Sequence, residues 1–134
     1  MTGETNLRRL LAGMTPVLQS GRFVFIALAS GQVPPADLAP MMSFREMEGV
    51  TLIVTEDAAR KRGLAGTFPC RMITLNVHSS LEAVGFLAAI TRHLAQAGMG
   101  VNPVSAFYHD HLFVPADRAE EAMRLLKELA ETSR

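Results

Sequence analysis

The stretch HSSLEAVGFLAAITRHLAQAGMGVNPVSAFYHDHLFVPADRAEEAMRLL, residues 78–126, carries the clearest structural pattern in the chain. Apolar residues recur in it at the spacing of amphipathic helices, and two short β-prone segments separate the helical parts. An alternating segment comes directly before it. The predicted order is strand, helix, strand, strand, helix, over 71–78, 81–97, 100–108, 111–115 and 116–131.

The boundaries of these elements have their own signals. Ser79 or Ser80 is expected to cap the first helix, with Glu82 in the first turn, where the helix dipole favours an acid. Gly98 is expected to end that helix. Pro103 indicates that the following strand lies at an edge or contains a bulge.

The first half of the chain has weaker patterns. It starts with helical spacing and continues with short β-prone runs separated by glycine and proline. We expect a hairpin around Ser20-Gly21, strands that meet near Glu48-Gly49, and a short helix closed by Gly63. The expected elements are a helix over 7–14, strands over 15–19 and 22–28, a loop over 30–40, strands over 41–46 and 50–55, and a helix over 56–64.

Composition excludes several classes of partner. Thirteen basic residues balance thirteen acidic ones, which argues against duplex DNA and anionic membranes. The longest apolar run, FVFIALA at 23–29, is too short to span a bilayer. Cys70, the single cysteine, supports neither an internal disulfide nor a thiolate zinc site. We expect a cytoplasmic protein that binds no nucleic acid and no membrane.

The triplet His109-Asp110-His111 admits three interpretations: a metal site, an acid–base pair or a turn. The strand order favours the turn, with His109-Asp110 as a two-residue link and Asp110 exposed. Zinc at His109 and His111 requires a third ligand, and His93 belongs to the long helix. No phosphate loop or nucleophile elbow is present in the sequence. We therefore predict no catalytic residues, no metal and no cofactor; a metal-dependent enzyme using His109 and His111 is the least favoured alternative.

The second half resembles the ACT domain, a small ligand-binding module with a ferredoxin-like βαββαβ fold. The resemblance rests on Gly85-Phe86-Leu87, Leu94-Ala95 and the glycine-rich 98–102, followed by HLFVP and an amphipathic helix. It covers residues 70–131 clearly and is similar to the tandem ACT modules of aspartate kinases. Short stand-alone tandem ACT-like proteins of unknown function are the nearest group.

The resemblance implies an α+β fold made of two ACT-like halves, residues 1–66 and 67–134. The first 40 residues depart from the ACT order, and the final ACT strand is missing after the last helix. Strand exchange between the halves, in which an N-terminal strand completes the C-terminal sheet, is one explanation.

The resemblance also implies a non-catalytic function, the binding of a small molecule, in particular an amino acid, between the first strand and first helix. A helix N-terminus offers free amide donors to a carboxylate, and Glu82 suits an ammonium group. Gly85 lets a ligand approach the backbone. The candidate ligand-binding residues are Ser79, Ser80, Glu82, Ala83, Val84, Gly85, Asn102 and Val104 in the second half, and Arg45 in the first.

These residues also have structural interpretations. Ser80 suits a helix cap, Gly85 suits helix–sheet packing, Asn102 suits a local backbone contact, and Arg45 suits an exposed strand position. The run Ser-Ser-Leu-Glu-Ala-Val also replaces the acid or asparagine that usually precedes the ACT glycine. The resemblance therefore does not identify the ligand.

A regulatory module without a catalytic domain transmits its signal through association. The expected partners are a small-molecule ligand and a second copy in a homodimer. The alternative is an ACT-like interaction or scaffold module that binds no ligand.

Overall fold

The computed structural model describes residues 3–134, and its internal contacts divide the chain into two compact units. Unit 1 combines the N-terminal segment up to Ser20 with Arg71–Arg134, and unit 2 is Gly21–Cys70. Within residues 3–134, no helix has the length and apolar character needed to cross a membrane. The division at 66/67 remains a proposal for the sequence halves, since contacts group the first 20 residues with the C-terminal part.

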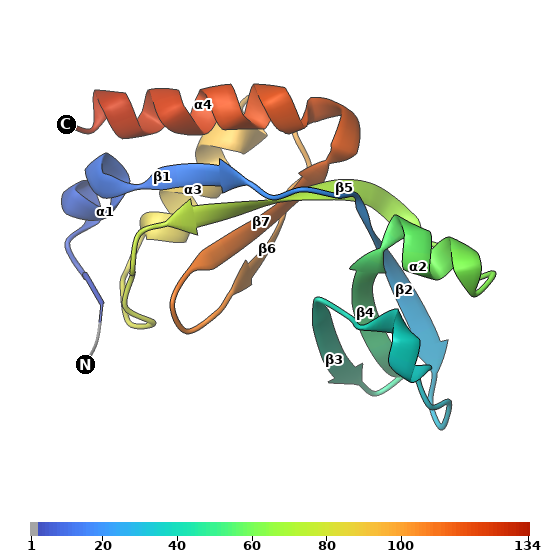
Figure 1. Cartoon of the computed structure of the whole chain (residues 1–134). Coiled ribbons are helices and arrows are strands. Elements are labelled where there is room, and N and C mark those ends of the chain that lie inside the picture. The colour runs from blue at the N-terminus through green and yellow to red at the C-terminus, as the bar shows by residue number, and fades with distance from the viewer. Residues whose placement is uncertain (1–2) are drawn as a thin grey trace. The chain divides into compact units, whose positions relative to one another are not determined.

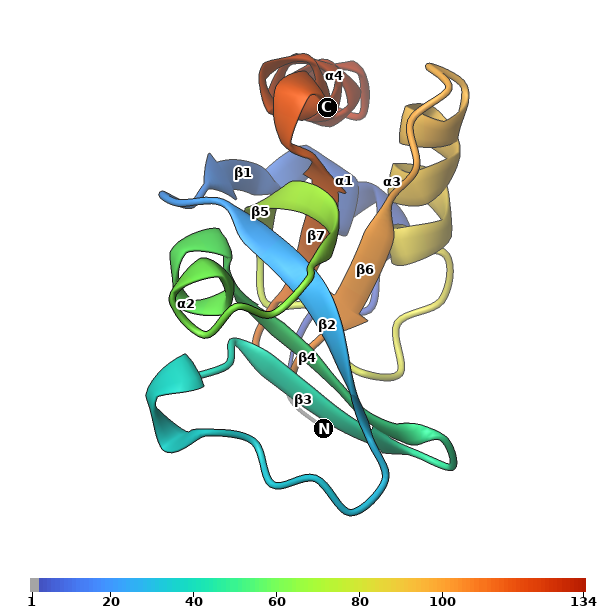
Figure 2. The ribbon, with the colours of Figure 1, turned by 90° about the vertical axis from the view of Figure 1, so that its right-hand side faces the viewer.

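Unit 1 is a four-stranded sheet with helices on one face (Figures 1 and 2). After β5, the chain forms a helix, two antiparallel strands and a helix, so the predicted order is confirmed. The sheet order is β1-β5-β7-β6. The elements are α1 (Leu7–Gly13), β1 (Thr15–Leu18), β5 (Thr67–Asn76, of which 71–76 belong here), α3 (Phe86–Ala95), β6 (Asn102–Ser105), β7 (Asp110–Pro115) and α4 (Ala119–Thr132).

The N-terminal strand β1 completes this sheet. It pairs antiparallel with β5, from Thr15 opposite Asn76 to Leu18 opposite Ile73. It occupies the edge next to the first strand, which the last strand takes in a ferredoxin-like fold. The predicted strand exchange is confirmed.

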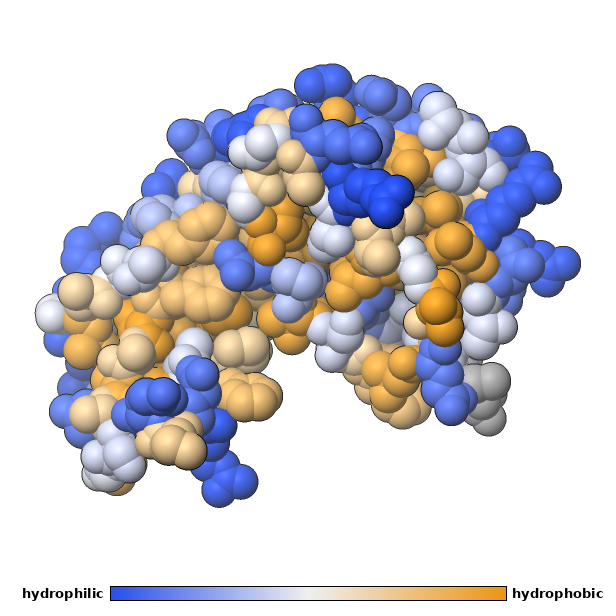
Figure 3. Space-filling view, turned by 180° about the vertical axis from the view of Figure 1, so that it is seen from behind, coloured by the Kyte–Doolittle hydropathy of each residue, from blue (hydrophilic) through white to orange (hydrophobic). Residues whose placement is uncertain are grey.

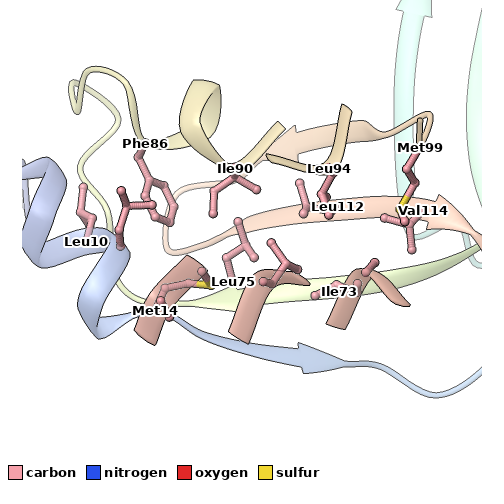
Figure 4. Packing of buried hydrophobic residues seen from close by; sticks show 14 of the residues in the cluster. Leu10, Met14, Ile73, Leu75, Phe86, Ile90, Leu94, Met99, Leu112 and Val114 are labelled. Carbon is pink, nitrogen blue, oxygen red and sulfur yellow. The ribbon is translucent and has the colours of Figure 1, made fainter. Parts of the chain in front are cut away.

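The core of unit 1 lies between the sheet and its helices. Leu10 lies beside Phe86 of α3, Met14 lies near Leu75, and Leu94 lies over Leu112 in the same cluster (Figure 4). The strands contribute alternate residues to this face, because successive side chains of a strand point to opposite sides. These strand residues are Ile73, Leu75, Leu112 and Val114.

Unit 2 has the same ferredoxin-like strand order, β3-β4-β2-β5. Its elements are β2 (Phe23–Ala29), β3 (Met42–Glu46), β4 (Gly49–Thr55), α2 (Glu56–Lys61) and residues 67–70 of β5. A short 3-10 helix, Ala36–Leu38, stands where an ACT unit has its first long helix. Helix α2 contacts β2 and β4 over a small apolar core (Figure 2). The core residues are Val24, Ile26, Leu38, Leu52, Val54 and Ala59.

Two residues in unit 2 have clear local structural roles, one at the start of α2 and one at the start of β4. The Thr55 side chain accepts a hydrogen bond from the Ala58 amide and caps α2. Gly49 begins β4 with a φ of 151°, and a Cβ there would lie 1.9 Å from the Leu28 carbonyl oxygen. A larger residue at this position would push β2 and β4 apart.

The hairpin expected around Ser20-Gly21 is wrong. Strand β1 pairs with β5 in unit 1, whereas β2 pairs along its whole length with β4 in unit 2. The Ser-Gly step therefore links two units. The reason is that a glycine turn signal does not record long-range pairing: β2 pairs with β4, a strand of its own length, and β1 pairs with the C-terminal part of β5.

The expected start of the helix over 81–97 is also wrong, because α3 begins at Phe86. Gly85 has a φ of 92°, which is incompatible with a right-handed helix. A helix over 81–97 therefore cannot continue through residue 85. The Ser80 hydroxyl accepts a hydrogen bond from the Glu82 amide at 3.1 Å, a local turn that competes with helix formation. Residues 79–84 are therefore a loop, and neither serine caps the helix.

We predict that Leu10→Ala lowers the free energy of unfolding by about 2–5 kcal/mol, because a fully buried side chain leaves a cavity. Leu7→Ala on the same helix is the matched control, since Leu7 is 39% exposed and its loss costs about 1 kcal/mol or less. Urea titrations of both variants measure the difference. Equal losses would show that α1 does not cover the core as described.

Candidate functional site

The loop between β5 and α3 is held at its start by the N-terminal segment. The Glu4 amide donates to the His78 carbonyl at 2.8 Å, and the Ser80 amide donates to the Glu4 carbonyl at 2.9 Å. Gly3 lies so close that a Cβ would be 2.6 Å from the Ser80 nitrogen. The first half of the candidate ligand loop is therefore fixed by backbone pairing.

A buried polar pair fixes the same region from the other side. The Ser79 hydroxyl donates to an Asp110 carboxylate oxygen at 3.3 Å, and the two residues are 9% and 7% exposed. Asp110 was expected in an exposed turn, and this expectation is wrong: it begins β7. It alternates with Leu112 on the side of the sheet that the helices cover, which explains its burial.

The strand link is correspondingly longer than expected. It runs from Ala106 to His109 and is closed by a hydrogen bond from the Ala106 amide to the His109 carbonyl, at 3.0 Å. The rings of Phe107 and Tyr108 lie 6.3 and 5.5 Å from the His78 ring. The turn and the loop therefore meet through three rings.

The second half of the loop is open. Glu82 and Val84 are exposed, and the Glu82 carboxylate has no partner within residues 3–134. Ala83 packs against the core. Gly85 then precedes α3 in the left-handed conformation, so the free amides of the first helical turn follow directly.

Gly85 also borders a surface hollow of about 400 Å³ between α3 and α4. Arg92 is the arginine that lines this hollow. Its side chain is exposed and forms no ion pair within the described part of the chain. The hollow is lined by Gly85, Ala88, Ala89, Arg92, His93, Gln96 and Leu129. A guanidinium beside small side chains suits a carboxylate on a small ligand.

The remaining candidates lie elsewhere. Asn102 and Val104 are on β6, opposite Phe113 and His111, and no hydrogen bond links their side chains to the loop in residues 3–134. Arg45 belongs to unit 2, where it lines a separate hollow of about 390 Å³. The structure therefore brings together the candidates over 79–85 and not the other three.

His78, Phe107 and Tyr108 lie at this loop and were not among the predicted site residues. Their residue types were visible, but the contact depends on which turn lies beside which loop. That arrangement follows from the sheet order and leaves no local signal in the sequence.

His111 lies on the face of the sheet away from the helices, beside Thr74. His111 Nδ1 lies 3.0 Å from Thr74 Oγ1, which also accepts a hydrogen bond from Gln19 Nε2 at 3.0 Å. The His109 and His111 rings are 6.3 Å apart, and residues 3–134 contain no cluster of three or more metal-binding side chains. Burial, and then the charge of His109, lowers the pKa of His111, while Asp110 opposes the shift.

Comparisons with known proteins give two matches to models described as the ACT domain, over residues 2–71 and 67–128. A Vibrio cholerae protein described as of unknown function and a possible transport protein is 39% identical, with a TM-score of 0.84, over 92% of this chain and 95% of that one. The comparison with curated proteins gives no match.

Two further solved structures share the fold. A protein from Agrobacterium tumefaciens is 17% identical, with a TM-score of 0.75, over 87% of this chain and 89% of that one. The regulatory subunit of aspartate kinase from Thermus thermophilus, in a ligand-free form, is 12% identical, with a TM-score of 0.62, over 85% of this chain and 95% of that one. The α+β fold with two ACT-like halves is confirmed.

We predict that Ser79→Ala destabilises the protein by about 1–3 kcal/mol, because the buried Asp110 carboxylate loses a hydrogen-bond donor. Ser105→Ala is the matched control, since Ser105 lies opposite Asp110 on β6 and is exposed. Denaturant titrations at neutral pH compare the two. A neutral Ser79 variant would contradict the assigned role.

We also predict that acidification destabilises unit 1 through His111. Its pKa in the fold lies below its ordinary value of 6.5, so the unfolded chain takes up the proton more readily. The free energy of unfolding should therefore fall as the pH drops through 6.5, and His111→Gln should flatten this dependence. Identical pH profiles for the wild type and the variant would refute this prediction.

Proposed function

Because the chain belongs to the ACT domain family, we propose that it is a non-catalytic regulatory module that binds a small carboxylate-bearing ligand, an amino acid, at the loop over 79–85. Binding is coupled to the association of two copies. The free thiol of Cys70, whose burial raises its pKa to about 12, suits the reducing cytoplasm.

The observation that carries the proposal is the open second half of the loop. Arg92 and the first amides of α3 offer positive charge to a carboxylate, and Glu82 offers negative charge to an ammonium group. Both side chains are exposed and have no charged partner within residues 3–134. This pair of opposite, unused charges suits an α-amino acid.

The other candidates take different roles in the proposal. Ser79 and Ser80 position the loop through the Asp110 carboxylate and the Glu82 amide. Ala83 and Val84 form its apolar wall. Asn102 and Val104 contribute backbone contacts along β6, and Arg45 is a separate carboxylate contact in unit 2.

A loop held at one end and open at the other provides a physical basis for signalling. Backbone pairing with Glu4 fixes residues 78–80, while the part from Glu82 to Gly85 has few contacts. A ligand that orders this part binds the ordered state more tightly and so shifts the population toward it. If association of two copies favours the same state, ligand binding and association strengthen each other.

A thermal-shift screen against the twenty amino acids tests the proposal. A ligand at about 100 times its dissociation constant stabilises the fold by roughly 2.7 kcal/mol, which raises Tm by several degrees. We expect Glu82→Gln and Arg92→Gln to abolish the shift without changing the ligand-free Tm, since both residues are exposed. Glu131→Gln on α4 is the control and should respond like the wild type.

If the ligand still raises Tm in both variants, the ligand binds at a site other than the loop. No shift with any amino acid would contradict the sensing function. That result would favour the interaction module, for which the exposed Phe107 and Tyr108 are the supporting observation, because aromatic side chains often anchor protein interfaces.

A further inference from the structure

The hollow between α3 and α4 in unit 1 has two chemically different parts. The part next to the loop is lined by small residues, and the part toward the C-terminal end of α3 is lined by Arg92, His93 and Gln96. Among the described residues, the lining of this hollow includes no acid. Figure 3 views the protein from the side on which α3 lies, and hydrophilic side chains lie among apolar ones on that surface. The second part of the hollow therefore suits an anionic group.

The three polar side chains in this part of the hollow are unused by the fold. Within residues 3–134, none of them takes part in a hydrogen bond or an ion pair. His93 Nε2 is in addition buried, and it has no hydrogen-bond partner in this part of the chain. Buried polar atoms usually have a partner, because an unmade hydrogen bond there is unfavourable. The torsion that turns a histidine ring is soft, so a small turn brings this nitrogen to the hollow.

Arg92 lies at some distance from the free amides at the start of α3. From Phe86 to Arg92 the helix advances by six residues, a rise of roughly 9 Å along its axis. The Arg92 side chain leans toward the N-terminus of the helix, as long helical side chains do, and closes part of this gap. A ligand with its α-carboxylate at the first amides therefore extends its own side chain toward Arg92.

We propose that the ligand is an acidic amino acid, glutamate or aspartate, whose side-chain carboxylate binds Arg92 and His93 in the hollow between α3 and α4. The inference rests on the proposed binding of an amino acid at the loop over 79–85 and names the class of amino acid. The ligand's ammonium group contacts Glu82, and its α-carboxylate lies at the start of α3. The planar guanidinium of Arg92 binds the second carboxylate through two parallel hydrogen bonds, and His93 adds another.

Other classes of side chain fit this part of the hollow less well. A lysine or arginine ligand brings a second cation to Arg92, and like charges repel each other. An aliphatic side chain covers the guanidinium and the His93 ring without giving either of them a partner, and an unpaired charge that loses water is unfavourable. Glutamine and asparagine offer a neutral oxygen, which forms a weaker hydrogen bond to a guanidinium than a carboxylate does.

Two pairs of matched ligands test the charge of the ligand side chain. Glutamate and glutamine have nearly the same size and differ in one carboxylate, and so do aspartate and asparagine. Calorimetric titrations of the full chain at neutral pH, up to millimolar ligand, measure the four dissociation constants. In at least one pair we expect the acid to bind about ten- to a hundredfold more tightly than its amide, as for the gain of a charged hydrogen bond.

Substitution of Arg92 tests the contact itself. Arg92→Gln should remove most of the preference for the acid over its amide, because a neutral side chain no longer distinguishes a carboxylate from an amide. Arg124→Gln on α4 is the matched control, since it removes the same charge from an exposed position outside the lining of this hollow and should keep the preference. Circular dichroism confirms that both variants are folded.

Three results would each overturn this inference: amides that bind as tightly as their acids, lysine or arginine as the tightest ligand, or an Arg92→Gln variant that keeps the full preference. Its failure is distinguishable from failure of the sensing function. If a non-acidic amino acid binds and Glu82→Gln abolishes that binding, the sensor stands and the acidic class is wrong. Glutarate lacks the ammonium group. If it binds as tightly as glutamate and Arg92→Gln abolishes its binding, the carboxylate contact stands and the amino-acid function fails.

Discussion

The antiparallel pairing of Thr15–Leu18 with residues 73–76 is the constraint on which the rest of unit 1 depends. Strand β1, from the N-terminal segment, forms the edge of the sheet next to β5. Through this pairing, α1 reaches the core, where Leu10 and Met14 pack on the helix-covered face. The backbone bonds that β5 would otherwise leave unmade at this edge are satisfied in the same step.

The same connection shapes the candidate site. With β1 in place, the preceding residues run back along the loop, so Glu4 pairs with His78 and Ser80. Ser79 and Asp110 bury a polar contact beneath that loop. Polar groups at this end are thus used to hold the backbone, whereas Glu82 and Arg92 keep their charges free. Polar groups that hydrogen-bond within the fold hold the loop in place, and the two charged side chains without a partner are the proposed ligand contacts.

Much of this architecture was predictable from the sequence. Apolar spacing located α3, α4 and the strand order of the second half, because long amphipathic segments have periods that differ clearly between helix and strand. The Ser-Gly hairpin and the start of α3 were wrong, because local turn and cap signals do not record long-range pairing or a positive φ at Gly85. Asp110 shows the same limit. Its burial depends on its alternation with Leu112, which an assumed two-residue turn obscured.

Native-state amide hydrogen exchange tests the completed sheet most directly. If β1 is an integral strand of unit 1, the hydrogen-bonded amides within 15–18 and 73–76 should exchange with one common free energy, equal to that of unfolding the unit. Fast exchange of the β1 amides, while those of 73–76 remain protected, would show that the N-terminal strand is not part of the sheet. Leu10, Met14 and Glu4 would then not be held against the core and the loop as described here for unit 1.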